Sequence, residues 1–144
     1  MKHRVVLADD HKLFREALRS MLQRQPDIDV VGEAGDGIQA LELVRALLPD
    51  VVVMDIRMPR LGGIAALQQL LAAHAAVKVI LLSVNSARVF AMEMLAAGAR
   101  GYVTKSDAEE LPRAIRTVMN GLEYLSLEVA AASAPAPGGG AAAA

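Results

Sequence analysis

The sequence predicts an α/β fold of the flavodoxin-like kind, a doubly wound sheet of five parallel strands in the order 2-1-3-4-5 with helices on both faces. Short apolar runs alternate along the chain with longer segments of helical periodicity. The runs are continuously apolar, which is typical of strands buried on both faces. Polar residues suited to chemistry follow these runs directly, where such folds place their ligands.

The predicted strands are the short apolar runs Val5–Ala8, Val30–Val31 with their flanks, Val51–Met54, Val77–Leu82 and Gly101–Thr104. Apolar residues after each run recur at the spacing of one helix face. These sets are Leu13, Phe14, Ala17, Leu18, Met21 and Leu22; Ile38, Leu41, Val44 and Leu48; Ile64, Leu67 and Leu71; Val89, Phe90, Met94 and Leu95; and Leu111, Ile115, Val118 and Met119. The crossovers are too short to contain an inserted domain.

Local signals indicate where several helices begin and end. Ser106 and Glu109 have the spacing of a capping box at the start of the last helix. Gly98 and Asn120–Gly121 stand where helix C-caps are expected. Pro112 is unfavourable inside a helix, so it predicts either a late start or a kink.

Length and composition indicate one domain. Of the 144 residues, we assign 1–130 to a globular unit and 131–144, rich in Ala, Ser, Pro and Gly, to a low-complexity tail or linker. The chain has 15 basic and 16 acidic residues, so it lacks the basic surplus of a domain held to DNA by phosphate neutralisation. We therefore expect no specific DNA binding by this chain and no attraction to an anionic membrane.

The absence of certain residues and segments narrows the function further. The chain has no cysteine, which excludes disulfides, thiol catalysis and cysteine-bound zinc. The N-terminal apolar run is too short for a secretory signal, and no run approaches membrane-spanning length. We therefore expect a cytoplasmic protein.

Polar side chains stand at the predicted carboxyl ends of four strands. Asp9 and Asp10 follow the first strand, Asp55 the third, Ser83 the fourth and Lys105 the fifth. The first and third strands would be neighbours at the switch point, so three carboxylates would share one crevice. Each residue also has a plainer interpretation, as a helix cap, a turn former or an exposed lysine. Together, however, the clustered acids need a compensating charge.

A hard divalent cation would supply that charge. All-oxygen carboxylate sites suit Mg²⁺, Mn²⁺ or Ca²⁺, and Mg²⁺ typically fills its shell with water and phosphate oxygens. Lys105 would then place a positive charge on the far side of a transferred phosphoryl group. The sequence thus predicts a site for accepting a phosphoryl group on Asp55 beside Mg²⁺.

The motifs that contain these residues closely resemble the receiver (CheY-like) domain of bacterial two-component response regulators. The matching segments, in order over roughly residues 1–130, are Val5–His11, Val53–Pro59, Gly62–Gly63, Leu81–Ser83 and Gly98–Lys105. The segment around Gly98–Ser106 is most similar to the NarL/FixJ-type subfamily, whose members usually carry a C-terminal LuxR-type helix-turn-helix. The resemblance implies a switch phosphorylated by a histidine kinase, whose output is transcription through a DNA-binding domain that does not follow Val129 here.

The resemblance implies a role for each acid of the site. Asp55 would be the phosphoacceptor. Asp10, Asp55 and the main-chain carbonyl of Arg57 would hold Mg²⁺ directly, and Asp9 would act largely through bound water.

The resemblance also assigns the residues that grip and sense the phosphoryl group. Lys105 and Ser83 would hold phosphoryl oxygens, and Tyr102 would turn inward when Ser83 moves. Arg57 and Asn85, each two residues beyond a reactive side chain, would tune self-hydrolysis. From the residues alone, the plainer interpretation of Tyr102 is a half-buried strand residue.

Two positions depart from the common family pattern. Gly62 stands where an acidic residue is common, which predicts a looser loop after Asp55. Ser106 follows Lys105 where many receivers have proline and a cis bond, so the sequence leaves the geometry of this peptide bond open.

Two other functions are less consistent with the residues of the site than a phosphorylatable receiver. A phosphatase with an aspartyl-phosphate intermediate would need a second acid two residues after the nucleophile, where this chain has Arg57. A degenerate receiver usually lacks an acid or the lysine, and this chain keeps both. Apolar Val84, Val89 and Met92 would form a homodimer face if exposed, or part of the core if buried.

Overall fold

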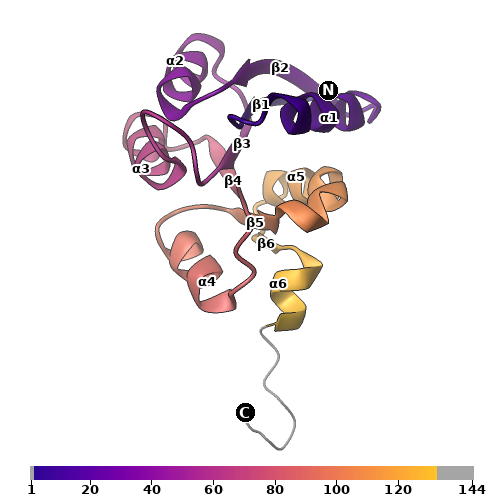
Figure 1. The fold of residues 1–144 in the computed structure, drawn as a ribbon. Helices are drawn as coiled ribbons and strands as arrows, with labels where there is room; N and C mark the ends of the chain where they lie inside the picture. Colours follow the sequence, from indigo (N-terminus) through magenta and orange to yellow (C-terminus); the bar gives the residue numbers. More distant parts are fainter. Residues whose placement is uncertain (1, 133–144) are drawn as a thin grey trace, which may run out of the picture.

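The computed structural model describes residues 2–132, in which strands and helices alternate (Figure 1). This confirms the predicted α/β class. In chain order the elements are β1 His3–Ala8, α1 Lys12–Gln23, β2 Ile28–Ala34, α2 Gly37–Leu47, β3 Val51–Asp55, α3 Gly63–Ala73, β4 Lys78–Ser83, α4 Arg88–Ala96, β5 Gly101–Thr104, the 3-10 helix η1 Lys105–Glu110, α5 Leu111–Met119, β6 Tyr124–Leu125 and α6 Leu127–Ala132.

All strand pairs in the sheet are parallel, and the strand order is β2-β1-β3-β4-β5-β6. The predicted order of the first five strands is confirmed, but the predicted number of strands is wrong. The sixth strand is the pair Tyr124–Leu125, which lies alongside Gly101 and Tyr102 at the edge of the sheet. Two residues are too few to show a strand periodicity in the sequence.

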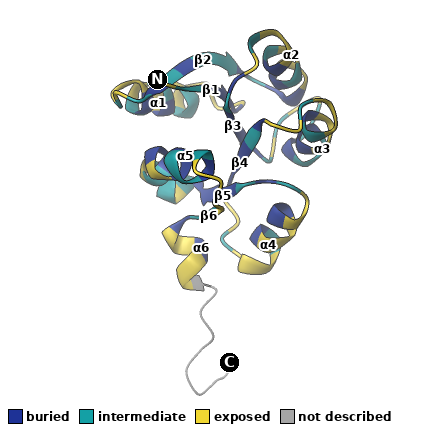
Figure 2. Cartoon of the chain, turned by 180° about the vertical axis from the view of Figure 1, so that it is seen from behind, coloured by how far each residue is buried: buried dark blue, intermediate teal, exposed yellow. Residues whose placement is uncertain are grey.

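The sheet is covered on both faces by separate hydrophobic cores (Figure 2). Val51 and Val53 point to the face covered by α1 and α5, whereas Val52 and Met54 point to the face covered by α2, α3 and α4. All residues of β3 are buried because β3 lies in the interior of the sheet with a core on each side. Asp55 at its end is therefore placed by a fully buried strand.

The helix ends agree with the sequence signals except in one case. Gly98 and Gly121 follow helices α4 and α5 with φ angles of +115° and +84°, as C-terminal glycines do. The predicted capping box of Ser106 and Glu109 is wrong, because residues 105–110 form a 3-10 helix and α5 starts only at Leu111. Pro112 lies in the first turn of α5, so it marks the late start of that helix.

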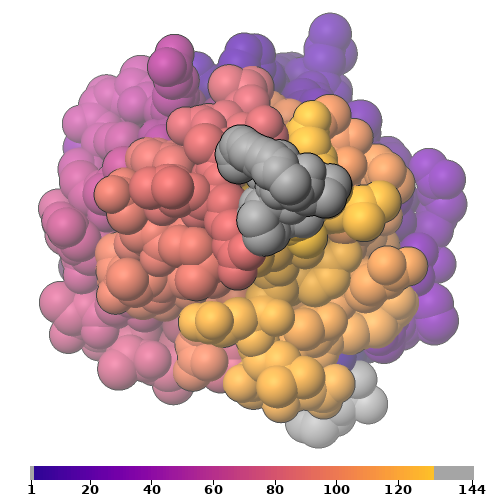
Figure 3. Space-filling model, turned by 90° about the horizontal axis from the view of Figure 1, so that it is seen from below, coloured from indigo at the N-terminus to yellow at the C-terminus, as the bar shows by residue number. Residues whose placement is uncertain are grey.

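The chain leaves the sheet through α6, which lies against α4 and β5 beside α5 (Figures 1 and 3). The predicted boundary between the domain and its tail at residue 130 falls inside this helix, and the rest of the predicted tail, residues 133–144, lies outside the described residues. Within residues 2–132, every helix is too short or too polar to span a bilayer.

An ion pair ties α5 to the turn before β2 and makes part of the stability dependent on pH. Arg116 donates to both carboxylate oxygens of Asp27, at 2.8 and 2.9 Å, and this hydrogen bonding is the main cause that lowers the pKa of Asp27 to about 2. A lowered pKa stabilises the fold above the ordinary value of 3.8, and that contribution is lost as the pH falls towards 2.

Arg116→Ala is therefore expected to lower the free energy of unfolding at pH 7 by about 1 kcal/mol, a figure kept small because both side chains are partly exposed. The difference from the wild type should shrink as the pH falls below 3.8. Urea denaturation of both proteins at several pH values measures it. A difference that does not change with pH would show that the ion pair is not its source.

Candidate functional site

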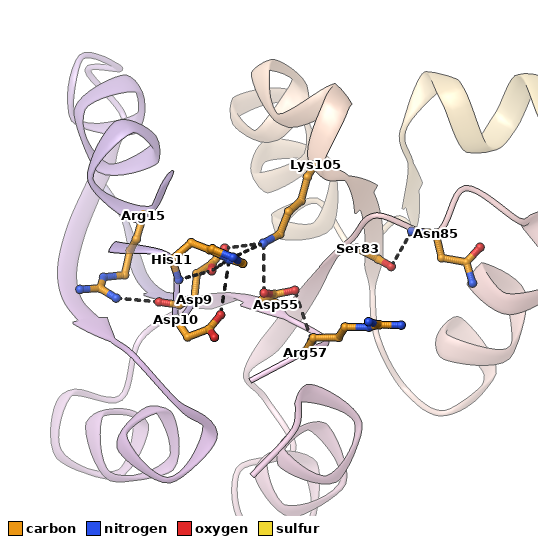
Figure 4. A network of polar contacts seen from close by, with 9 residues as sticks. All are labelled: Asp9, Asp10, His11, Arg15, Asp55, Arg57, Ser83, Asn85 and Lys105. Carbon is orange, nitrogen blue, oxygen red and sulfur yellow. Dashed lines mark hydrogen bonds and ion pairs between the residues drawn. The ribbon is translucent and has the colours of Figure 1, made fainter. Parts of the chain in front are cut away.

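The carboxyl ends of the strands bring together the side chains that the sequence singled out (Figure 4). Asp9 follows β1, Asp55 ends β3, Ser83 ends β4 and Lys105 follows β5. Asp9 and Asp55 are 1% and 3% exposed, so both carboxylates are buried. Asp55 also makes the contact of a turn former, since its Oδ1 accepts from the main-chain nitrogen of Arg57. Neither Asp9 nor Asp10 is the N-cap of α1, which is His11, and Ser83 does not cap α4, whose N-cap is Ala87.

Lys105 joins the two buried acids. Its ammonium nitrogen lies 3.1 Å from an oxygen of Asp9 and 3.1 Å from Oδ2 of Asp55, and the ring of Phe14 lies 4.9 Å away. The Lys105 side chain is only 17% exposed. Its interpretation as an ordinary surface lysine is therefore wrong.

Burial and neighbouring charges together set the pKa values of Asp55 and Lys105. Burial raises the pKa of Asp55, the Lys105 hydrogen bond opposes this, and the neighbouring charge of Asp9 raises the pKa further. For Lys105, burial by itself lowers the pKa, but its bonds to Asp55 and Asp9 outweigh burial and the net pKa is raised. Lys105 thus stays charged, whereas keeping Asp55 ionised in the folded state lowers the free energy of unfolding.

Asp55→Asn is expected to raise the free energy of unfolding at pH 7, because burial and the neighbouring charge of Asp9 raise the pKa of Asp55 in spite of the Lys105 hydrogen bond. The raised pKa means that the penalty is absent below 3.8 and grows as the pH rises through the folded-state value, so the two proteins should converge in acid. Denaturation between pH 3 and 8 tests this. Asp29→Asn on β2, outside the acidic cluster, is the control; a destabilised Asp55→Asn protein at pH 7 would contradict the argument.

The acidic cluster fits a hard divalent cation. Ligand atoms of Asp9, Asp10, His11 and Asp55 all lie within 4.8 Å of one another. Oδ2 of Asp9 is buried and accepts no hydrogen bond of good geometry, even though the Lys105 ammonium lies nearby. A buried carboxylate oxygen without a hydrogen bond suits a metal ion or its bound water.

A cleft of about 440 Å³ opens over Asp55. It is lined by His11, Asp55, Ile56, Arg57, Ser83, Val84, Asn85, Phe90 and Lys105. A larger cavity of about 680 Å³ lies between α5 and the segment of β6 and α6, and Asp9, Asp10 and Asp55 are not among its lining residues. The cleft over Asp55 therefore contains the reactive carboxylate, hydroxyl and ammonium groups, although it is not the largest cavity among the described residues.

Ser83, which supplies the hydroxyl of the site, is linked to Tyr102 by hydrogen bonds through the main chain of Asn85. Ser83 is 6% exposed, and its Oγ accepts a hydrogen bond from the main-chain nitrogen of Asn85 at 3.0 Å. The Tyr102 hydroxyl donates to the main-chain oxygen of Asn85 at 2.6 Å, and its ring packs edge-on against Phe90. Tyr102 is completely buried, so the half-buried interpretation is wrong and the side chain points inward in this structure.

The two predicted tuning residues lie beside the cleft. The main-chain nitrogen of Arg57 donates to Oδ1 of Asp55 at 3.3 Å, and both Arg57 and Asn85 line the cleft. The peptide bond between Lys105 and Ser106, which the sequence left open, is trans like every other bond in residues 2–132. The apolar residues of the possible dimer face, Val84, Val89 and Met92, are 75%, 75% and 42% exposed.

Sequence reasoning missed two residues that build the site. His11 lies with Nδ1 3.3 Å from Asp9, 3.5 Å from Asp10 and 3.4 Å from Lys105, and its position next to the acid pair was the only signal. Arg15 on α1 donates to the main-chain oxygen of Asp9 at 2.6 Å and so fixes the end of β1. Nothing in its helical spacing distinguished Arg15 from a surface arginine.

Comparison with known proteins gives a consistent assignment. Residues 5–116 match the response regulator receiver domain family. The chain is 38% identical over 129 residues to the transcriptional regulatory protein DegU of Brevibacillus brevis, and 41% identical over 128 residues to the response regulator GacA of Pseudomonas viridiflava. These alignments cover 89% and 88% of the chain but only 55% and 60% of the two relatives, so the chain spans little more than half of their length.

Solved structures agree with the sequence relatives. A LuxR-family two-component response regulator from Aurantimonas has a TM-score of 0.86 and 37% identity, with 91% of this chain and 94% of that chain covered. The receiver domain of a NarL regulator from Mycobacterium tuberculosis has a TM-score of 0.74 and 35% identity, with 83% and 95% covered. The chain belongs to the response regulator receiver domains of two-component systems, and its resemblance to the NarL/FixJ-type subfamily is confirmed.

Proposed function

We propose that this receiver domain accepts a phosphoryl group on Asp55 from a phosphohistidine of a sensor histidine kinase. The observation that carries the proposal is the placement of Asp55: its carboxylate is 4% exposed, lines an open cleft and lies 3.1 Å from a buried ammonium. In the transfer, a carboxylate oxygen of Asp55 forms a bond to phosphorus as the phosphorus–nitrogen bond of the donor breaks. The electron pair of that bond stays with the departing imidazole.

Asp9, Asp10 and Asp55, together with the main-chain carbonyl of Arg57, would hold Mg²⁺ in this site. When bound, the ion would neutralise the charge that builds up on the transferred group. The buried Asp9 oxygen that accepts no well-formed hydrogen bond supports this donor set.

Lys105 and Ser83 would stabilise the phosphoryl group from the other side. The Lys105 ammonium already lies 3.1 Å from the attacking carboxylate, so it can pass to a phosphoryl oxygen with a small movement. Ser83 Oγ accepts from Asn85, which leaves its hydroxyl proton available for donation. A movement of Ser83 towards the phosphoryl group would reach Tyr102 through Asn85 and so bias a two-state equilibrium.

The chain would act as a switch and not as a turnover enzyme. The position two residues after Asp55 is Arg57, which cannot serve as the general acid and base of an aspartyl-phosphate phosphatase. Arg57 and Asn85 would instead tune slow self-hydrolysis from the edge of the cleft. The output would be transcriptional and lie in the part of the longer relatives that this chain does not span, and the exposed residues Val84, Val89 and Met92 would support a homodimer.

The test is labelling by a small phosphodonor such as phosphoramidate, followed by intact mass with and without Mg²⁺. We expect one phosphoryl group per chain that requires both Mg²⁺ and Asp55. Asp55→Asn should not be labelled, whereas the control Asp29→Asn, on β2, should behave as wild type. Equal labelling of Asp55→Asn and wild type would refute the assignment.

A further inference from the structure

The C-terminal segment of the described chain, residues 124–132, lies next to the loop that carries Lys105. In Figure 3 this segment (yellow) fits between α4 (salmon) and α5 (orange). Val129 of α6 is completely buried in the same core cluster as Tyr102 and Ala91. The segment is therefore an integral part of the domain, although no catalytic residue lies in it.

One contact fixes the backbone just before Lys105. The main-chain nitrogen of Thr104 donates to Oγ of Ser126 at 3.1 Å, and the two residues are 1% and 0% exposed. The main-chain nitrogen of Ser126 donates in turn to the main-chain oxygen of Tyr102 at 3.0 Å. Ser126 thus continues the β5–β6 ladder by one residue with its side chain, at the point where β5 ends.

Further contacts fix the backbone just after Lys105. Ser106 Oγ donates to a carboxylate oxygen of Glu128 at 2.8 Å, and the main-chain nitrogen of Glu128 donates to Asp107 at 2.7 Å. The main-chain nitrogen of Leu127 and the hydroxyl of Tyr124 both donate to Glu110, which closes the other end of η1. The serine that replaces the usual proline after Lys105 is therefore bonded to α6.

The backbone of Lys105 is thus held on both sides by a segment that follows it by about twenty residues. From this fixed main chain, the Lys105 side chain extends to the carboxylates of Asp9 and Asp55. A side chain of this length positions its charge well only if its own main chain is fixed. The hydrogen bonds of Ser126 and Glu128 supply that fixation.

We propose that Ser126 and Glu128 are positioning residues for Lys105, and that the docking of α6 sets how well Lys105 stabilises the transferred phosphoryl group. This inference rests on the proposed function. If Lys105 also contacts the phosphoryl group once it is on Asp55, then at equilibrium phosphorylation of Asp55 and the docking of α6 must favour each other by the same free energy. The segment that leads out of the domain is then coupled to the phosphoryl site through Lys105.

The experiment measures the rate of phosphorylation by phosphoramidate at saturating Mg²⁺, together with the melting temperature, on the full 144-residue chain. Removing one buried hydrogen bond by Ser126→Ala should slow the reaction roughly tenfold, and Glu128→Gln should slow it roughly threefold. Ser106→Ala should match Glu128→Gln, and Ser106→Thr, which keeps the hydroxyl, should restore the rate. Thr117→Ala, whose hydroxyl bonds to its own helix α5, is the matched control and should leave the rate unchanged.

Combination with Lys105→Ala separates positioning from a general loss of structure. If the two residues act through Lys105, then Ser126→Ala and Glu128→Gln should slow the Lys105→Ala protein by less than about twofold. Effects that persist in full in the Lys105→Ala background, or no effect of Ser126→Ala in the wild type, would overturn the inference. Should Ser126→Ala not fold, Glu128→Gln and Ser106→Ala, both at exposed positions, decide the question.

The same data keep the two proposals apart. If Lys105→Ala itself phosphorylates at the wild-type rate, the role of Lys105 in the proposed function is wrong and the positioning inference falls with it. If Lys105→Ala is slow but the effects of Ser126 and Glu128 are additive to it, the proposed function stands and only the positioning inference is wrong.

Discussion

Lys105→Ala should lower the rate of Asp55 phosphorylation by about 10²- to 10³-fold, because a fixed charge in a water-poor site stabilises an anionic transition state far more than a charge in water does. The structure places that charge 3.1 Å from the attacking carboxylate and shields it from solvent. Mg²⁺ affinity should not fall. The ammonium is also 3.1 Å from Asp9, so its removal takes a repelling charge away from two of the expected metal ligands.

Two measurements on the same variant decide this prediction: the rate of phosphorylation by phosphoramidate, and a calorimetric titration with Mg²⁺. Lys12→Ala is the control, since Lys12 begins α1 near the site but its side chain is 75% exposed and 3.9 Å from Glu16. It should change neither quantity. A large loss of Mg²⁺ affinity in Lys105→Ala would mean that the lysine supports the metal site and not the phosphoryl group.

Gly63→Ala should lower the free energy of unfolding by about 2 kcal/mol, through the backbone shift that an overpacked site requires. A Cβ atom at Gly63 would lie 2.4 Å from the main-chain oxygen of Asp55 and 2.8 Å from Cα of Ile56. Neither atom can move without displacing the end of β3. The variant should therefore also phosphorylate more slowly, although it alters no reactive group.

The neighbouring glycine provides a matched control. A Cβ atom at Gly62 would meet nothing closer than 3.5 Å, and its φ of −72° suits any residue. Gly62→Ala should therefore change the free energy of unfolding by less than about 0.5 kcal/mol, with lower chain entropy partly offset by a poorer N-cap. Urea denaturation of both variants tests the pair, and equal effects at Gly62 and Gly63 would contradict the packing argument.

The fold class, the order of the first five strands and the clustering of Asp9 with Asp55 could all be predicted from the sequence. The reason is physical: in a parallel sheet buried on both faces, strands read as continuous apolar runs, and the residues after them must meet at one edge. Asp9, Asp55 and Lys105 could thus be placed together from their positions after strands. The roles of Asp10, Arg57 and Asn85 came from the family resemblance and are still predictions.

The contacts that hold these residues in place could not be predicted and are visible only in the folded chain. The sequence favoured a half-exposed Tyr102, and its complete burial depends on packing against Phe90 and α6, which no local pattern encodes. The sequence predicted that the hydroxyl of Ser106 caps its own helix, but it donates to Glu128 and also lies 3.3 Å from the hydroxyl of Thr104. Local spacing can show that a cap is possible, but it cannot show that a better partner lies twenty residues away.

The sequence did not predict β6 or α6 for the same reason. Tyr124–Leu125 is too short to display a period, and Ser126 joins the sheet through its side chain. These residues gain their structure from β5, whose outer hydrogen-bonding groups would be unpaired without β6 and Ser126. The reactive groups of the site could therefore be predicted from the residues that follow the strands. The hydrogen bonds that fix the main chain around Lys105 became visible only in the arrangement of β5, β6 and α6.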